Sequence, residues 1–423
     1  MEPAPDEAAL PASWSRRTFS ALWERNFRLF FVGQFISNSG NWLTIVALTL
    51  LVLHRTGSGV AVGLLGACQF GPMLVLSAFA GLVADRSDKR KLLYLTQSLE
   101  MAQSATLAVL AFLPHVPLPV FFVVAVLGGA MLAFDNPGRR SFVNEMVPPR
   151  LVPNAVTLYS ANVNLSRMVG PTLAAVLIAT VGYGWSFALD AASYLAVLFS
   201  LWRMRGDELR PAPKTPRGRG QVRAGLRYIA GVPELWITFL TLLVVGVLSY
   251  NFTVVLPLFV ERGLHGSDSD FALIYATFSA GAVVGALVVA RRTAMTVRTV
   301  VWACLGLGAA MLAMTFVPNV GVAFPAAALV GATSVVYLTV TTALVQLRAE
   351  RHMVGRVLAL QAVLLIGTTP VGGPILGLLA DSAGGRAPVL LGAAGALLAG
   401  AAAWILERRV VVVLAPEEEL ADV

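Results

Sequence analysis

The sequence predicts an all-α integral membrane protein with twelve transmembrane helices in two pseudo-symmetric six-helix bundles. Three observations predict this class: the composition, the number of long apolar runs, and landmarks that repeat between the two halves. Of the 423 residues, 57% are hydrophobic and 13% are charged, and the mean hydropathy is +0.76. Soluble domains carry about 25% charged residues. We therefore expect most of the chain to lie in a bilayer.

Twelve apolar runs are each long enough to cross a membrane as a helix. Their approximate limits are 29–53, 60–84, 92–113, 118–136, 155–181, 185–203, 234–260, 271–290, 298–317, 321–346, 357–380 and 388–406.

The distribution of Lys and Arg predicts the orientation of these runs. The even-numbered turns hold most of the basic residues, whereas the odd-numbered turns hold only Arg55, Arg262 and Arg386. Because basic loops stay on the cytoplasmic side, we expect a multi-pass protein of the plasma membrane with both termini in the cytoplasm.

Landmarks recur at nearly the same offset in the two halves. Gly81 and Gly285 end the second and eighth runs and lie 285 − 81 = 204 residues apart. Pro171 and Pro374 follow glycines in the fifth and eleventh runs, at an offset of 374 − 171 = 203. The predicted organisation is a cytoplasmic segment with an amphipathic helix around Trp14–Arg28 (1–28), an N-terminal bundle (29–203), a cytoplasmic linker (204–233), a C-terminal bundle (234–406) and a cytoplasmic tail (407–423).

One short charged stretch joins the second and third runs: Gly81-Leu82-Val83-Ala84-Asp85-Arg86-Ser87-Asp88-Lys89-Arg90-Lys91. Such a loop cannot lie in lipid and is expected to turn at the membrane surface. Gly81 permits close approach of a neighbouring helix. Asp85 lies where its carboxylate can accept hydrogen bonds from the N-terminus of another helix.

This stretch resembles the loop signature of the major facilitator superfamily. The resemblance implies that the aspartate and arginine latch the two halves together on the cytoplasmic side, and the matching residues are Gly81, Asp85, Arg86, Asp88 and Arg90. Two further sections resemble the enterobactin-exporter, macrolide-efflux and Tap-like branch: 26–42 and 144–155. That branch implies export by rocking of two bundles, driven by proton exchange.

Four ionisable residues inside the runs are candidates for proton coupling: Glu100, Asp135, Arg167 and Asp190. Ionisable groups inside a membrane are costly and mark functional pathways. We expect Glu100 about two helical turns from the cytoplasm. Asp135 is expected at the cytoplasmic mouth, paired with the nearby arginines. Asp190 lies near the start of its helix, where the helix dipole alone could account for a carboxylate.

The fifth run carries a polar stripe on one helix face, formed by Ser160, Asn164, Arg167 and Pro171. The pair Gly170-Pro171 resembles a helix-5 motif of proton-exchanging exporters, although Ala174 and Ala175 replace its downstream glycines. A Gly-Pro kink that serves only helix packing is the alternative.

Neutral polar and aromatic residues at helical spacing are candidates for lining a substrate cavity. A pocket of this kind suits bulky, partly apolar ligands. The candidates are Gln34, Asn38, Asn41, Asn164, Tyr250, Asn251, Phe252, Tyr275, Phe278, Tyr337 and Thr341.

The sequence contains no Walker-type nucleotide motif and no metalloprotease or serine-hydrolase motif, so we expect neither an enzyme nor an ATP-driven pump. We expect no cofactor or metal, with a proton gradient as the energy source, and no nucleic acid partner. The expected partners are protons, the lipid bilayer and a small-molecule substrate, and the chain is expected to act as a monomer. The predicted function is proton-coupled export of drug-like or siderophore-like molecules. Two alternatives remain open, a lipid or lysolipid flippase and a non-transporting membrane receptor.

Overall fold

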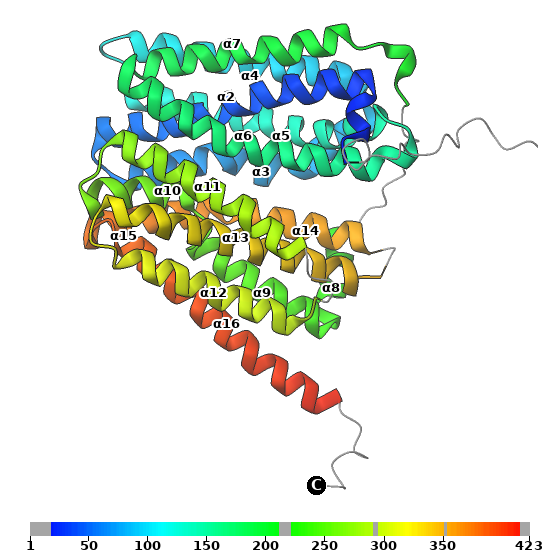
Figure 1. Cartoon of the computed structure of the whole chain (residues 1–423), viewed down its shortest axis with the longest axis vertical. Helices are drawn as coiled ribbons and strands as arrows, with labels where there is room; N and C mark the ends of the chain where they lie inside the picture. Colours follow the sequence, from blue (N-terminus) through cyan, green and yellow to red (C-terminus); the bar gives the residue numbers. More distant parts are fainter. Residues whose placement is uncertain (1–17, 211–220, 291–294, 351–352, 415–423) are drawn as a thin grey trace, which may run out of the picture.

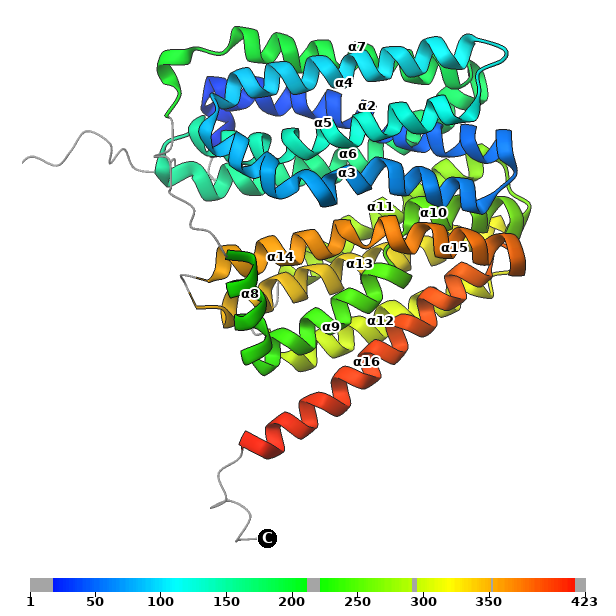
Figure 2. The ribbon, with the colours of Figure 1, turned by 180° about the vertical axis from the view of Figure 1, so that it is seen from behind.

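The structure is a computed structural model that describes residues 18–210, 221–290, 295–350 and 353–414. Its regular elements are all helices, and they form two packed halves (Figure 1). The expected all-α membrane fold is confirmed. Figure 2 shows from behind how α16 slants away from the second half.

The first half, here called the N-half, consists of six long helices. They are α2 (Arg25–Thr56), α3 (Gly59–Arg86), α4 (Lys89–Phe112), α5 (Leu118–Glu145), α6 (Val152–Thr180) and α7 (Tyr183–Arg203). Short 3-10 helices precede α2, precede α6 and follow α7: η1 (Ser20–Trp23), η2 (Pro149–Leu151) and η3 (Gly206–Glu208).

The second half, here called the C-half, contains two interrupted spans. Its elements are α8 (Gln221–Gly231), α9 (Pro233–Leu248), α10 (Phe252–Leu258), the π-helix η4 (Phe259–Gly263), α11 (Asp268–Ala290), α12 (Val297–Thr315), α13 (Val320–Arg348), α14 (Val354–Gly367), α15 (Thr369–Ala383) and α16 (Ala387–Leu414). The first interruption separates α9 from α10, where Asn251 Nδ2 donates to the carbonyls of Gly246 and Val247. The second separates α14 from α15 at Thr368, just before Pro370.

Among the described residues, eleven segments are long and apolar enough to cross a membrane, with α9–η4 and α14–α15 each counted once. The remaining long helix, α4, is more polar because one face buries Thr96, Gln97, Glu100 and Ser104. It packs lengthwise against α5 and α7 (Figures 1 and 2). With α4, the two halves contain six spans each.

The amphipathic helix expected over Trp14–Arg28 is wrong for its described part. Residues 14–17 lie outside the described residues, and Glu24 has an extended backbone that separates η1 from α2. The N–H of Ala21 donates to Asn154 Oδ1 at 2.9 Å, and Phe27 is fully buried. Ala21, Leu22 and Phe27 therefore pack onto the N-half, whereas Phe19 and Trp23 are 46% and 65% exposed.

The two ends of the molecule differ in charge and in how closely the halves approach. We call the end that carries Arg86, Lys89, Arg90, Lys91 and Arg150 the basic end. At the opposite end α3 and α15 cross closely, so that a Cβ atom on Gly373 would lie 3.0 Å from the carbonyl oxygen of Gly63. Only residues without side chains allow such contact between two backbones.

The halves separate toward the basic end. On α3, Val62 near the opposite end is buried together with Val254 and Leu258 of the C-half, whereas Val75, farther along the helix, is 77% exposed. Figure 1 shows the ribbons of the two halves converging near α10 and α15 and diverging near α8. The halves are thus in contact at the opposite end and diverge toward the basic end, and we call the region between their diverging ends the opening.

Candidate proton-coupling and substrate sites

A buried acidic cluster lies inside the N-half, between α2, α4 and α5. Asp135 is fully buried, forms an ion pair with Arg139, and accepts hydrogen bonds from Thr96 Oγ1 and Gln97 Nε2, both at 2.8 Å. Arg139 also donates to Asn38 Oδ1 on α2. This guanidinium therefore ties α2 to α5 across the interior.

The predicted placement of Asp135 at the cytoplasmic mouth is wrong, although its pairing with an arginine is observed. The fourth apolar run was expected to end at residue 136, but α5 continues through Pro137 to Glu145. A proline removes one hydrogen bond without ending this helix. The continuation places Asp135 two to three turns inside the helix.

Glu100 extends the cluster along α4. Its Oε2 accepts from Gln97 Nε2 at 3.1 Å and lies 4.0 Å from Arg139 Nη2. Its Oε1 is buried and has no hydrogen-bond partner. One oxygen of Glu100 is thus available to a proton or a water molecule.

Asp190 connects three helices rather than capping one. It accepts from Thr44 Oγ1 of α2 and Ser104 Oγ of α4, each at 2.7 Å, and from Ser193 Oγ at 3.3 Å. It is 1% exposed and lies two turns into α7. The interpretation of Asp190 as a simple helix-dipole carboxylate is therefore wrong.

A small cavity of about 50 Å³ lies between Glu100 and Asp190. Glu100 and Asp190 both contribute to its wall, together with Asn41, Thr44, Gln69, Gln103, Ser104 and Tyr194. A polar space of this size holds one or two water molecules, which can relay a proton between carboxylates.

The charges inside the N-half do not balance when all groups are ionised. The cluster and the cavity contain the carboxylates of Glu100, Asp135 and Asp190 but one guanidinium, that of Arg139, among the described residues. An unpaired buried charge costs several kcal/mol. Protonation of a carboxylate removes that cost, so this site can exchange protons.

Arg167 lies at the apex of the opening between the halves. It is midway along α6, and its guanidinium carbon lies 4.6 Å from the centroid of the Trp42 ring. Its backbone oxygen accepts from Ser279 Oγ of α11, so this face of α6 points toward the C-half. On the same face, Pro171 and Ala174 are buried, whereas Ser160 and Asn164 on the basic side are exposed.

The aromatic candidates form a connected layer at the boundary of the halves. Phe252 and Phe278 have ring centroids 4.6 Å apart, and Tyr275 lies 5.8 Å from Phe278 and 6.3 Å from Trp42. Tyr250 joins the layer through Phe252 and donates to the Ser334 carbonyl.

The remaining candidates for the substrate cavity lie inside one half rather than at the boundary between the halves. Tyr337 and Thr341 are fully buried inside the C-half, where Tyr337 Oη donates to Thr241. Asn251 binds backbone carbonyls at the helix interruption. Gln34 and Asn38 are buried inside the N-half, and neither amide atom of Gln34 has a hydrogen-bond partner. Asn41 lines the N-half cavity.

Gly170 lies at a close contact of α6 with α2. A Cβ atom there would approach the Trp42 side chain and the Ser39 carbonyl. Pro171 is buried beside it within an unbroken α6. Both residues therefore contribute to packing at the point where Arg167 meets Trp42.

The latch residues contact only the N-half in this conformation, as far as the described residues go. Asp88 caps α4 by accepting from the N–H of Lys91 at 3.1 Å. Arg90 donates to the carbonyls of Leu201 and Trp202 at the end of α7. Gly81 is half-buried and Arg86 is exposed; the side chain of Asp85 lies outside the described residues. A latch between the halves stays a prediction.

The fold and these sites define a membrane transporter of the major facilitator type. The transmembrane secretion effector family (MFS_3) matches residues 16–418, and the chain belongs to that family. It is a multi-pass membrane protein and not an enzyme.

Two curated relatives are 26% identical to this chain. The staphyloferrin A transporter of Staphylococcus aureus aligns with 62% of the chain and 66% of its own length. The multidrug efflux pump Tap of Mycolicibacterium fortuitum aligns with 88% of the chain and 93% of its own length.

Solved structures share the fold. A bacterial homologue of the human lysosomal transporter Spinster matches with a TM-score of 0.70 at 16% identity, over 94% of this chain and 98% of that one. The peptide transporter POT matches with a TM-score of 0.72 at 13% identity, over 91% and 95%.

Sequence reasoning did not assign several residues of the acidic cluster. Arg139 lies beyond the predicted end of the fourth run at residue 136, although the i, i+4 spacing of Asp135 and Arg139 is typical of an ion pair on one helix. Gln97 lies one turn before Glu100, so its place on the same helix face was predictable from the sequence. Thr44 and Trp42 had no distinguishing signal, because their partners are distant in the sequence.

Proposed function

We propose that this transporter is a proton-coupled exporter of amphipathic, drug-like or siderophore-like small molecules. The observation that carries the proposal is the buried cluster of three carboxylates and one arginine beside a polar cavity in the N-half. The names of the two curated relatives, one a multidrug efflux pump and one a siderophore transporter, support the substrate class.

The cluster can couple proton uptake to the position of the N-half helices. Asp135 and Glu100 hold Arg139, and Arg139 holds Asn38 on α2. Protonation of either carboxylate weakens the attraction to the guanidinium. Because α2 also carries Trp42 at the boundary of the halves, a change in this attraction can alter the position of Trp42 beside the substrate path.

The basic end supports one orientation of the chain in the membrane. With that end in the cytoplasm, as basic loops require, the described opening faces the cytoplasm and admits substrate from the inside. Protonation from the outside after rearrangement would complete antiport.

The test is transport by the purified chain in proteoliposomes under an imposed pH gradient, with anionic, neutral and cationic fluorescent amphiphiles as probes. We expect gradient-driven movement of at least one probe and its loss in Glu100→Gln and Asp190→Asn. Asp270→Asn is the control, because Asp270 is a carboxylate outside the cluster that accepts hydrogen bonds from Ser267 at the start of its own helix. Transport that persists after collapse of the gradient would exclude proton coupling. Transport of labelled lysolipid without transport of any fluorescent probe would favour the flippase alternative.

A further inference from the structure

The guanidinium of Arg167 has no counter-charge among the residues that the structure describes. It makes no ion pair with any carboxylate of the described residues, and its buried Nε has no hydrogen-bond acceptor. A cation at the centre of a membrane helix costs at least about 2.5–3.5 kcal/mol and normally has a partner. A contact with Trp42 compensates for only about 0.5–2 kcal/mol.

The helices that face Arg167 supply no acid near it. In the described part of the C-half the carboxylates lie toward the ends of helices, on Glu234, Glu261, Asp268, Asp270, Glu350, Asp381 and Glu407. Among the buried acids of the N-half, Glu100 and Asp135 lie at Arg139, Asp190 binds three hydroxyl groups, and Glu145 pairs with Lys89. The two interior arginines therefore differ: Arg139 is neutralised by protein, and Arg167 is not.

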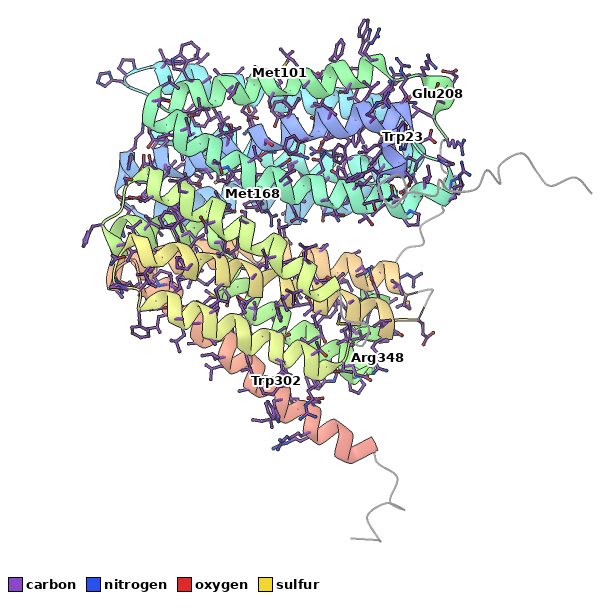
Figure 3. All side chains as sticks on the ribbon, viewed as in Figure 1. Trp23, Met101, Met168, Glu208, Trp302 and Arg348 are labelled. Carbon is purple, nitrogen blue, oxygen red and sulfur yellow. The ribbon has the colours of Figure 1, made fainter. Side chains whose placement is uncertain are left out.

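The surroundings of Arg167 are apolar on one side and open on the other. Trp42 and Tyr275 form an aromatic wall next to it. Asn164 and Ser160, one and two turns toward the basic end on the same face, are exposed. Figure 3 labels Met168, the next residue, at the boundary between the halves.

We propose that Arg167 anchors the substrate and that the preferred substrates are amphipathic anions, with a carboxylate attached to an aromatic or apolar body. The planar guanidinium binds a carboxylate through two parallel hydrogen bonds. The aromatic wall accepts the apolar body. The inference deepens the proposed function, since it assumes that a small amphipathic molecule enters the opening between the halves.

The test is equilibrium binding to the purified chain in detergent, without any pH gradient. The probes are carboxylates of naphthalene, anthracene and pyrene, each compared with its carboxamide and its methylammonium analogue. We expect the carboxylate of at least one scaffold to bind about tenfold more tightly than its carboxamide, as one charge-assisted contact provides. Absence of a carboxylate preference in all three scaffolds would overturn the inference.

Two variants test whether Arg167 causes the preference for carboxylates. Arg167→Gln should reduce the carboxylate-to-carboxamide ratio to about one, since the remaining contacts are apolar. Arg203→Gln is the control, because Arg203 also lies over a tryptophan, Trp202, but outside the opening, and it should leave the ratio unchanged. A ratio that survives Arg167→Gln would overturn the assignment.

A second variant does not require removal of Arg167. Asn164→Asp places a carboxylate three residues away on the same helix face, where it can pair with Arg167. We expect it to weaken carboxylate binding while Asn164→Ser does not, and equal binding by the two variants would contradict the proposal. The binding experiment uses no pH gradient, so its result can be interpreted even if transport is not coupled to protons. Likewise, the absence of an anion preference would not contradict proton coupling.

Discussion

The carboxylate of Asp381, near the end of α15, accepts a 2.6 Å hydrogen bond from the N–H of Gly59, the first residue of α3. It also accepts from the N–H of Val60 and from Ser58 Oγ, both at 3.0 Å. Arg262 lies 2.7 Å from the same carboxylate. Since Asp381 belongs to the C-half and α3 to the N-half, this side chain joins the halves at their closed end.

The sequence around Asp381 repeats the start of the predicted latch. Gly377-Leu378-Leu379-Ala380-Asp381 has the pattern of Gly81-Leu82-Val83-Ala84-Asp85, and the two segments lie near the ends of the neighbouring helices α15 and α3. A carboxylate at the N-terminus of a partner helix, expected for Asp85, is observed for Asp381 at the other end of the molecule.

We predict that Asp381→Asn shifts the chain toward a conformation open at this end. The variant removes the charge and one acceptor oxygen. A loss of about 1–2 kcal/mol changes the ratio of conformations roughly 5- to 30-fold. Spin-label distances between cysteines at His115 and Ser382, in a chain lacking Cys68 and Cys304, measure the shift. Asp270→Asn is the control, because Asp270 caps only its own helix through Ser267. Equal distance distributions in the parent and Asp381→Asn would contradict the prediction.

The glycine crossing of α3 and α15 is a second requirement for closure. We predict that Gly63→Val keeps the halves apart at this end, because its side chain would enter the backbone of Gly373. The same spin labels should report a longer distance, and transport should be lost. Gly306→Ala tests the helix substitution itself, since nothing lies within 4 Å of a Cβ atom there. A Gly63→Val chain that closes normally would show that the crossing is not tight.

The Asp135–Arg139 pair should be energetically coupled. Removing one partner of a buried ion pair costs about 3–5 kcal/mol, because the other charge stays unpaired. Asp135→Asn and Arg139→Gln should each lower the thermal unfolding temperature in detergent. The double variant should be less destabilised than the sum of the two. Simple additivity would mean that the two side chains do not interact.

The two arginines of the latch sequence should behave differently. Arg90 binds carbonyls at the end of α7, so Arg90→Ala should destabilise the chain by about 1.5–3 kcal/mol. Arg86 is exposed, so Arg86→Ala should change stability by less than about 0.5 kcal/mol. If Arg86 latches the halves in the other conformation, its variant should still slow transport. Thermal unfolding and initial transport rates separate the two effects, and unchanged transport by Arg86→Ala would refute the latch role.

The sequence by itself determined the class of protein, the number of spans and the presence of costly charges inside them. These properties depend on the free energy of transferring each side chain from water to an apolar environment. This free energy adds up along an apolar run, whichever helices later pack against it. The same reasoning correctly predicted a local partner for Asp135. It also matched Gly81 with Gly285 and Gly170 with Gly373. Gly170, Gly285 and Gly373 lie at close helix contacts in the structure.

Only the tertiary structure decided which polar groups meet. Asp190 binds hydroxyl groups 146 and 86 residues away, and Asp381 caps a helix 322 residues away. No spacing rule contains such contacts, because they depend on the packing of whole helices. The same packing neutralises Arg139 inside one half and leaves Arg167 facing the other half, without a counter-charge in the described part of the chain.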